Sequence, residues 1–257
     1  MRIRLVMMFI IIYLFPYAAY ATGHEWDKLD QISDEALQLT KNARLQEAKQ
    51  LLEYFEQQFT LFREDIHSMD VIYVLTATHE EALKAVSASS VPMEQRVNQL
   101  TQFRLAVDAV QAKHQPLWKE MKFAVMSAFE KMKQAMEQED EQSFQQAFHQ
   151  FLQRYQLIEP SVKINADREH VQRVSAHISL LEAPAFQQLH ATERMKELRQ
   201  MEEDLQALFA DEKKEAALPS LWWVMTSIGG MIIMTLTYVG WRKYRGEKER
   251  RMVRDKQ

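Results

Sequence analysis

The sequence predicts an all-α protein of about seven or eight helices, packed as antiparallel hairpins or a bundle, with one C-terminal transmembrane helix. The first reason is glycine. Gly23 is the only one of the five glycines that precedes residue 221, whereas a β-rich domain of this length needs glycine at many turns and bulges. The second reason is that apolar residues in the middle of the chain recur every three or four positions, which is the period of an amphipathic helix.

The N-terminal segment, residues 1–21, is predicted to be a signal peptide. A basic start is followed by the apolar run 5–15, which ends at Pro16. Ala19 and Ala21 then form the small-x-small pattern that predicts cleavage after Ala21. An uncleaved membrane anchor needs about 20 apolar residues, so this run is too short to be one.

Residues 22–217 are predicted to form an extracytoplasmic helical domain. Proline ends or kinks a helix, and four prolines mark expected boundaries: Pro92, Pro116, Pro160 and Pro184. The expected helices span residues 25–40, 43–62, 70–86, 93–111, 117–138, 141–157, 167–181 and 184–210. The short connection Lys41–Asn42 makes the first two helices antiparallel neighbours.

Two of these hairpins give a hint of an internal repeat, and the spacing in the first, from Ile32 to Phe55, resembles that of a tetratricopeptide unit. Ala36 and Ala48 are twelve residues apart, and so are Ala135 and Ala147. Any tight helical hairpin favours small residues at such places, and a repeat array needs about three stacked units for stability. An ordinary hairpin is therefore the favoured interpretation, and a peptide-binding solenoid is the alternative.

Residues 221–241 are predicted to cross a membrane once. This segment carries no charged side chain and would be about 31 Å long as a helix, close to a hydrocarbon core of about 30 Å. Aromatic rings and cations favour the two edges of a bilayer. The expected membrane-interface anchors are Trp222, Trp223, Trp241, Arg242 and Lys243.

The two sides of this segment differ in charge. Residues 242–257 contain eight Lys or Arg and three Asp or Glu, whereas the body has a net charge of −11. The positive-inside rule therefore places the tail in the cytoplasm and the body outside the cell membrane. The acidic body argues against binding to nucleic acid, and only the tail suits anionic lipid headgroups.

No motif predicts catalysis, cofactor binding or metal binding. The chain contains no cysteine, which excludes disulfides, thiolate metal sites and a cysteine nucleophile. His79 does not begin a zinc-binding His-Glu-x-x-His motif, because Leu83 occupies the second ligand position. His170 and His177 share a helix face, but two histidines bind a metal only if a facing helix adds ligands. The run Glu202–Asp204 is interpreted as a solvated helix face. We therefore expect no enzyme.

Two stretches, together with this layout, resemble the sporulation protein YpjB family of endospore-forming Bacillus relatives. The first is Ser33–Leu39, which leads to Gln46–Ala48, and the second is Phe148–Tyr155, which continues into Ile158–Val162. The resemblance implies a role linked to sporulation. It carries over no catalytic or ligand-binding residue.

The leading hypothesis is a non-enzymatic membrane-anchored protein whose extracytoplasmic domain binds another, unidentified protein. The alternative is an extracytoplasmic ligand or metal sensor that signals through a partner membrane protein, because the tail 242–257 is too short to fold as an output domain. A hydrolase with an unrecognised site is the third hypothesis. It ranks last because catalysis needs positioned acid, base or nucleophilic groups, and the sequence reveals none.

Overall fold

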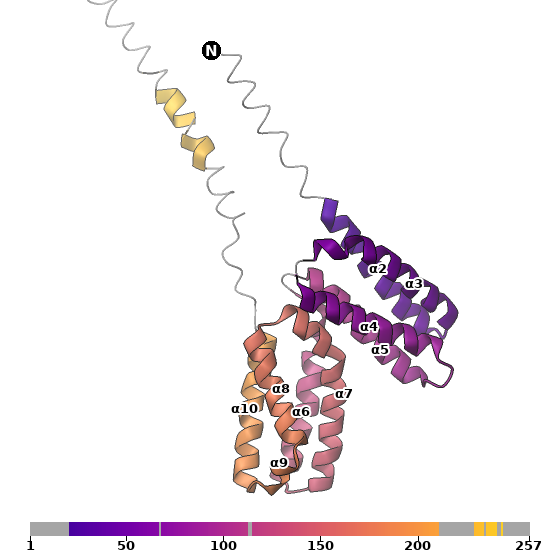
Figure 1. Ribbon diagram of the computed structural model, residues 1–257. Coiled ribbons are helices and arrows are strands. Elements are labelled where there is room, and N and C mark those ends of the chain that lie inside the picture. Colours follow the sequence, from indigo (N-terminus) through magenta and orange to yellow (C-terminus); the bar gives the residue numbers. More distant parts are fainter. Residues whose placement is uncertain are drawn as a thin grey trace, which may run out of the picture. The chain divides into compact units, whose positions relative to one another are not determined.

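The computed structural model contains helices and no strand in the residues that it describes (Figure 1), so the predicted all-α class is confirmed. The described residues are 21–66, 68–112, 115–210, 229–233, 235–240 and 243. The chain divides into one unit over Met1–Asp211, called the body here, and a second over Glu212–Gln257.

The N-terminal half of the body is made of two antiparallel hairpins. Its elements are α2 (Ala21–Lys41), α3 (Leu45–Phe62), the short 3-10 helix η2 (Arg63–Asp65), α4 (Met69–Ser87) and α5 (Met93–Gln111). Helix α2 packs against α3 and α5, and α4 packs against α3 and α5. Their apolar stripes meet in one core, in which Phe55 and Phe103 touch edge to face with ring centroids 4.8 Å apart.

The C-terminal half has a second core. Its elements are the 3-10 helix η3 (Leu117–Met121), α6 (Lys122–Glu137), α7 (Glu141–Asn165), α8 (Arg168–Glu182), α9 (Pro184–Gln188) and α10 (Ala191–Ala210). Helix α6 packs on α7 and α10, and α8 packs on α10. Phe129, Phe144 and Phe151 lie at the centre of this core.

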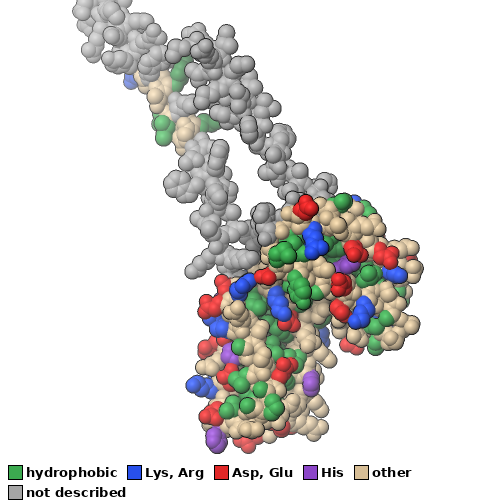
Figure 2. All heavy atoms as spheres, in the orientation of Figure 1, with side chains coloured by type: hydrophobic (Ala, Val, Ile, Leu, Met, Phe, Trp, Pro, Cys, Tyr) green, Lys and Arg blue, Asp and Glu red, His purple; other side chains and the backbone are tan. Residues whose placement is uncertain are grey.

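Helices α5 and α7 join the two halves. The Asn165 side-chain amide, at the end of α7, donates to the carbonyls of Ala109 at 3.1 Å and Ala112 at 2.9 Å, at the end of α5. Ile164 packs against both cores. Polar side chains cover the outside, and Figure 2 shows acidic and basic side chains interspersed over one face. The body is therefore two cores that share a central pair of helices.

Pro160 does not end a helix, contrary to the prediction. It lies inside α7, where a proline has no N–H to donate to the carbonyl four residues earlier. That carbonyl belongs to Gln156, and the side-chain amide of Gln102 on α5 donates to it at 2.8 Å. A tertiary contact thus replaces the helical hydrogen bond that proline removes, and α7 continues to Asn165.

The other three prolines stand at boundaries, as predicted. Pro92 precedes α5, Pro116 precedes η3, and Pro184 begins α9. The predicted helix 184–210 is wrong in one respect, because it consists of α9 and α10 with an extended Leu189 between them. The short α9 buries Phe186 against Phe144, with ring centroids 5.9 Å apart.

Two hairpins share one connection. At the ends of α2 and α6, Ala43 and Glu139 have φ angles of 58° and 54°, and the backbone hydrogen bonds around them follow the same pattern. These equivalent residues are 96 positions apart in the sequence, whereas Ala36 and Ala135 are 99 apart. The alanine spacing therefore does not mark equivalent places, although all four alanines of that spacing are buried as a tight hairpin requires.

Much of the predicted membrane segment lies outside the described residues. This applies to residues 221–228 and 234, and to the anchors Trp222, Trp223, Trp241 and Arg242. The described parts are helical, and Lys243 is exposed. Among described residues, no helix combines the length and the apolar character that crossing a membrane requires. Residues 1–20, with Ala19, also lie outside the described part, and α2 begins at Ala21.

Candidate functional site

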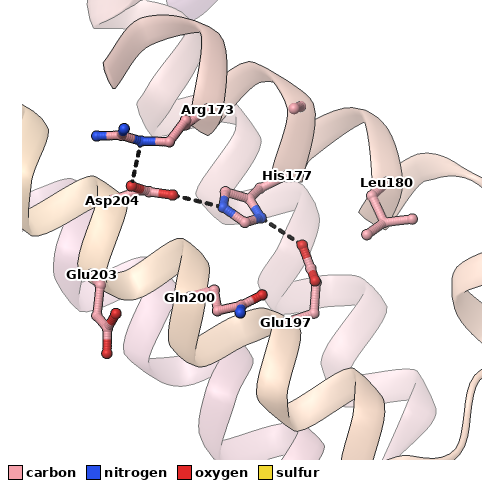
Figure 3. Close-up of a pocket in the computed structure, with 8 residues that line it drawn as sticks. Arg173, His177, Leu180, Glu197, Gln200, Glu203 and Asp204 are labelled. Carbon is pink, nitrogen blue, oxygen red and sulfur yellow. Dashed lines mark hydrogen bonds and ion pairs between the residues drawn. The ribbon is translucent and has the colours of Figure 1, made fainter. Parts of the chain in front are cut away.

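An open pocket of about 470 Å³ lies between α8 and α10 (Figure 3). The two helices run antiparallel, and their apolar residues Val174, Leu198 and Leu205 are buried in the core. Polar side chains on the flanks of this contact surround the pocket. The lining residues are Arg173, Ala176, His177, Leu180, Glu197, Gln200, Glu203 and Asp204.

Local capping fixes where each of the two helices begins. The Asp167 carboxylate accepts a hydrogen bond from the Glu169 backbone N–H at 2.7 Å, which satisfies a free donor in the first turn of α8. At the start of α10, the Glu193 carboxylate accepts from the His190 backbone N–H at 3.2 Å. These contacts help to define where α8 and α10 begin.

His177 is held between two carboxylates of α10 (Figure 3). Its Nδ1 lies 2.6 Å from Glu197 Oε1, and its Nε2 lies 2.9 Å from Asp204 Oδ2. The other oxygen of Asp204, Oδ1, is 2.8 Å from Arg173 Nε. We call His177, Glu197, Asp204 and Arg173 the α8–α10 clasp, because they link the two helices.

Further partners occupy the rest of the Arg173 guanidinium. Its Nη1 is 2.5 Å from Glu169 Oε1, and its Nη2 is 2.5 Å from His170 Nδ1. Both terminal nitrogens of Arg173 are therefore hydrogen-bonded within the same chain, whereas its buried Nε forms an ion pair with Asp204 but no hydrogen bond. The charged groups of the clasp are paired with one another.

The number of protons on an imidazole determines how many of the two His177 contacts can be hydrogen bonds. A neutral imidazole carries one N–H, so it donates to one carboxylate only, whereas an imidazolium donates to two. The His177 side chain is 13% exposed, and those of Glu197 and Asp204 are 21% and 20% exposed. Both contacts are hydrogen bonds to ionised carboxylates only when His177 is doubly protonated.

This arrangement does not suit catalysis by His177. A histidine that activates a nucleophile needs one ring nitrogen for the nucleophile and the other for an orienting carboxylate. Here both ring nitrogens face carboxylates. A metal site needs ligands that converge on one point, but Glu197 and Asp204 lie at opposite nitrogens of the ring. Within the described residues, no group of three or more histidine and carboxylate side chains is placed to hold a metal ion.

The histidines differ in their surroundings. His170 contacts Arg173, and His177 contacts Asp204, the ion-pair partner of Arg173, so the two histidines share a helix face as expected. Of these two histidines, His177 lines the pocket and His170 does not. His79 is buried, with its Nε2 2.8 Å from the Leu52 carbonyl oxygen, and it stacks on Phe55. His79 is therefore a core residue with a satisfied hydrogen bond.

The interpretation of Glu202–Asp204 as a solvated face is wrong for two of its three residues. Asp204 belongs to the clasp, and Glu202 Oε2 is 3.0 Å from Lys133 Nζ on α6. Only Glu203 is exposed. Glu197 and Asp204 are seven residues apart and so share a helix face, which could have flagged them. Nothing in the sequence indicated that α8 would be their neighbour.

Comparison with known proteins gives a match over nearly the whole chain. The model of the family "Sporulation protein YpjB" matches residues 26–253. A protein of Bacillus subtilis (strain 168), described as "Uncharacterized protein YpjB", is 29% identical over 260 residues, which cover 99% of this chain and 98% of that protein. No solved structure matches. The chain therefore belongs to the sporulation protein YpjB family, and this membership supports a sporulation-linked role.

Proposed function

We propose that the protein is a membrane-anchored, non-enzymatic module whose extracytoplasmic helical domain binds another protein during sporulation. One observation carries the non-enzymatic part of this proposal. The pocket's histidine and arginine, the groups best suited to chemistry, are paired with carboxylates of the same pocket. The pocket therefore acts as a link between two helices, and binding falls to the outer surface of the body.

The second unit supports the anchoring part of the proposal. Its described residues expose large apolar side chains. The space beside Gly229, Gly230 and Gly240, where a side chain would begin, contains no other atom within 4 Å. Such a surface is unfavourable in water and favourable in hydrocarbon. The exposed side chains are Met231, Ile232, Ile233, Leu236, Tyr238 and Val239. The uncharged sequence 221–241 and the basic tail 242–257 agree with one span whose tail is cytoplasmic.

Two measurements test anchoring and topology. We expect the intact protein to stay with membranes washed at alkaline pH, which strips peripheral proteins. Protease added to sealed protoplasts should digest the body and spare the tail 242–257. Release by the wash, or protection of the body, would contradict the proposal.

Cross-linking of the full chain in sporulating cells tests partner binding. A bifunctional reagent followed by affinity purification should recover the same protein from independent cultures. Substitutions of exposed residues of the body should reduce the amount recovered. A matched chain in which only the tail is shortened should recover it equally. Recovery of no reproducible protein from either chain would argue against an interaction module.

The alternative function is a ligand or metal sensor, and one observation favours it. The clasp holds α10, and α10 is the helix that precedes the predicted span in the sequence. A ligand that opened the clasp would act directly on that connection. A sensor predicts that Zn²⁺, Ni²⁺ or a small metabolite raises the melting temperature of the folded protein, since a ligand that binds only the folded state stabilises it. It also predicts that His177→Gln abolishes the rise.

A further inference from the structure

One end of the body collects the start of α2 and the end of α10. Trp26 of α2 contacts Phe59 near the end of α3, with ring centroids 6.4 Å apart, and Trp118 of η3 contacts Phe209 of α10 at 5.5 Å. We call this the exit end, because the chain enters and leaves the body there.

Other contacts bring four more helix termini to the exit end. Arg168, the first residue of α8, is 2.7 Å from Asp70 in the first turn of α4. The Asp108 carboxylate near the end of α5 accepts from the Leu117 backbone N–H of η3 at 2.7 Å. Burial raises the pKa of Asp108, and this N–H opposes the rise. Asn165, at the end of α7, bonds to the end of α5 as described above.

The most exposed large apolar side chains of the body are all at the exit end. Leu61 is the penultimate residue of α3, Met69 begins α4, Tyr73 lies one turn later, and Phe123 is the second residue of α6. We call these four residues the apolar rim. Their exposed fractions are 68% for Leu61, 72% for Met69, 74% for Tyr73 and 84% for Phe123. Among described residues of the body, the other exposed large apolar side chains are Tyr54 at 36% and Met93 at 40%.

The length of the connection determines what the exit end can reach. Helix α10 ends at Ala210, and only residues 211–220 separate it from Leu221, where the predicted span begins. Ten residues extend over at most about 35 Å. If the span lies in the bilayer, the end of α10, and with it the exit end, lies within about 35 Å of the start of the span.

The chemistry of the rim suits the headgroup region of a bilayer. Phenylalanine, tyrosine, methionine and leucine favour that boundary, and cations beside them can reach the phosphates. Exposed Arg63 and Lys122 stand close in sequence to Leu61 and Phe123, but exposed Glu64 and Glu120 offset their charge. Apolar contact, and not attraction to anionic lipid, should therefore dominate.

We propose that the apolar rim inserts into the membrane leaflet on the side of the body and holds the exit end against the lipid. This proposal rests on the anchoring proposed above and adds a second contact between the protein and the lipid. Without such a contact, four large apolar side chains at one end of the body would face water. With it, the body has a fixed orientation relative to the membrane.

Single cysteines provide the test, because the chain contains none. Tyr73→Cys and Phe123→Cys are labelled with an environment-sensitive fluorophore in the full chain, reconstituted into phosphatidylcholine nanodiscs. We expect a blue-shifted emission, loss of most of the fluorescence when the lipids carry nitroxides, and protection from aqueous iodide. Discs that contain phosphatidylglycerol should give the same result.

Met93→Cys is the matched control. Met93 is also an exposed apolar residue, but it begins α5, whose 19 residues place it about 27 Å from the exit end. Its label should remain open to iodide and unaffected by lipid nitroxides. Circular dichroism checks that each labelled variant keeps its helix content.

A label at Thr237→Cys separates the two proposals. Quenching by lipid at Thr237 but not at Tyr73 and Phe123 would overturn the rim contact and leave the anchoring intact. Absence of lipid quenching at Thr237 would overturn the anchoring, and the rim proposal would fall with it. Protection of the rim labels from iodide without quenching by lipid nitroxides would also overturn the proposal, because it would indicate that a protein surface and not lipid covers them.

Discussion

Both halves of the body use arginines to connect helices, since Arg194 of α10 lies 2.9 Å from Glu141 of α7, but the halves differ in their other polar links. In the N-terminal half the main connecting groups are Arg96 and Arg104. Arg96 is buried and donates from Nε to the Val91 carbonyl at 2.8 Å and from Nη2 to the Ala88 carbonyl at 2.7 Å. In the C-terminal half the corresponding link is the α8–α10 clasp, built on an imidazole between two carboxylates.

A second arginine link in the N-terminal half joins α5 to α2. Arg104 of α5 binds Asp30 of α2 through two hydrogen bonds of 2.5 and 3.0 Å. Burial raises the pKa of the Asp30 carboxyl, and the guanidinium beside it opposes that rise. Arginine keeps its charge at all working pH values, whereas an imidazole changes its number of donors. The comparison teaches that the two halves differ in one link, because the C-terminal half places an imidazole between two carboxylates where the N-terminal half places guanidinium groups beside backbone carbonyls and a carboxylate.

The largest effect should come from the cores. Phe151→Ala in the C-terminal core and Phe55→Ala in the N-terminal core each remove a fully buried ring, and each should lower the free energy of unfolding by about 3–5 kcal/mol. Because α5 and α7 join the cores, we expect one transition in urea, with circular dichroism and tryptophan fluorescence in step. Two separate transitions would show that the halves unfold independently.

Loss of the Arg96 side chain should have the next largest effect. Arg96→Met keeps the apolar stem but leaves carbonyls at the end of α4 without donors, which should cost about 2–3 kcal/mol in urea unfolding. Arg96→Lys, the control, retains the charge but has fewer hydrogen-bond donors. Its free energy of unfolding should lie between those of Arg96→Met and the parent protein. Equal stability of Arg96→Met and the parent protein would show that the Arg96 hydrogen bonds do not stabilise the N-terminal half.

The clasp should contribute less, because it is partly exposed. His177→Leu leaves Glu197 and Asp204 facing an apolar group and should cost about 1–2 kcal/mol. His177→Gln supplies donors and should recover part of the loss. A double-mutant cycle with Glu197→Gln measures the coupling, and additive effects would indicate that the clasp does not hold α8 to α10.

The bond that accommodates Pro160 provides a smaller test. Gln102→Ala leaves the Gln156 carbonyl without its donor and should cost about 1 kcal/mol. In a Pro160→Ala background, residue 160 regains an N–H, so the same Gln102→Ala change should cost much less. A cost that is equal in both backgrounds would mean that Gln102 stabilises the α5–α7 contact in another way.

The smallest expected effect is a gain in stability. Ala43 and Glu139 adopt positive φ angles in equivalent connections of the two halves, and glycine adopts such angles without steric cost. Ala43→Gly and Glu139→Gly should each raise the melting temperature, with a gain of up to about 1 kcal/mol. A gain at one position only would show that the two connections differ in strain.

Much of the candidate site was beyond prediction from the sequence. The shared face of His170 and His177 follows from helical periodicity, because the two residues are about two turns apart. The roles of Glu197 and Asp204 do not follow, since they depend on α10 packing against α8. Charged residues on a helix look alike in sequence whether they face water or a neighbouring helix, and Glu202 and Asp204 illustrate this ambiguity.

The sequence by itself determined the all-α class and the positions of most helices, because the spacing of apolar residues and the scarcity of glycine act within one element. It also located the breaks at Pro92, Pro116 and Pro184, where a missing N–H and a fixed φ end a helix locally. Only the tertiary structure decided that α7 runs through Pro160, because the replacement donor, Gln102, lies 54 residues from its acceptor Gln156. The clasp depends in the same way on contacts between distant segments, which local patterns do not encode.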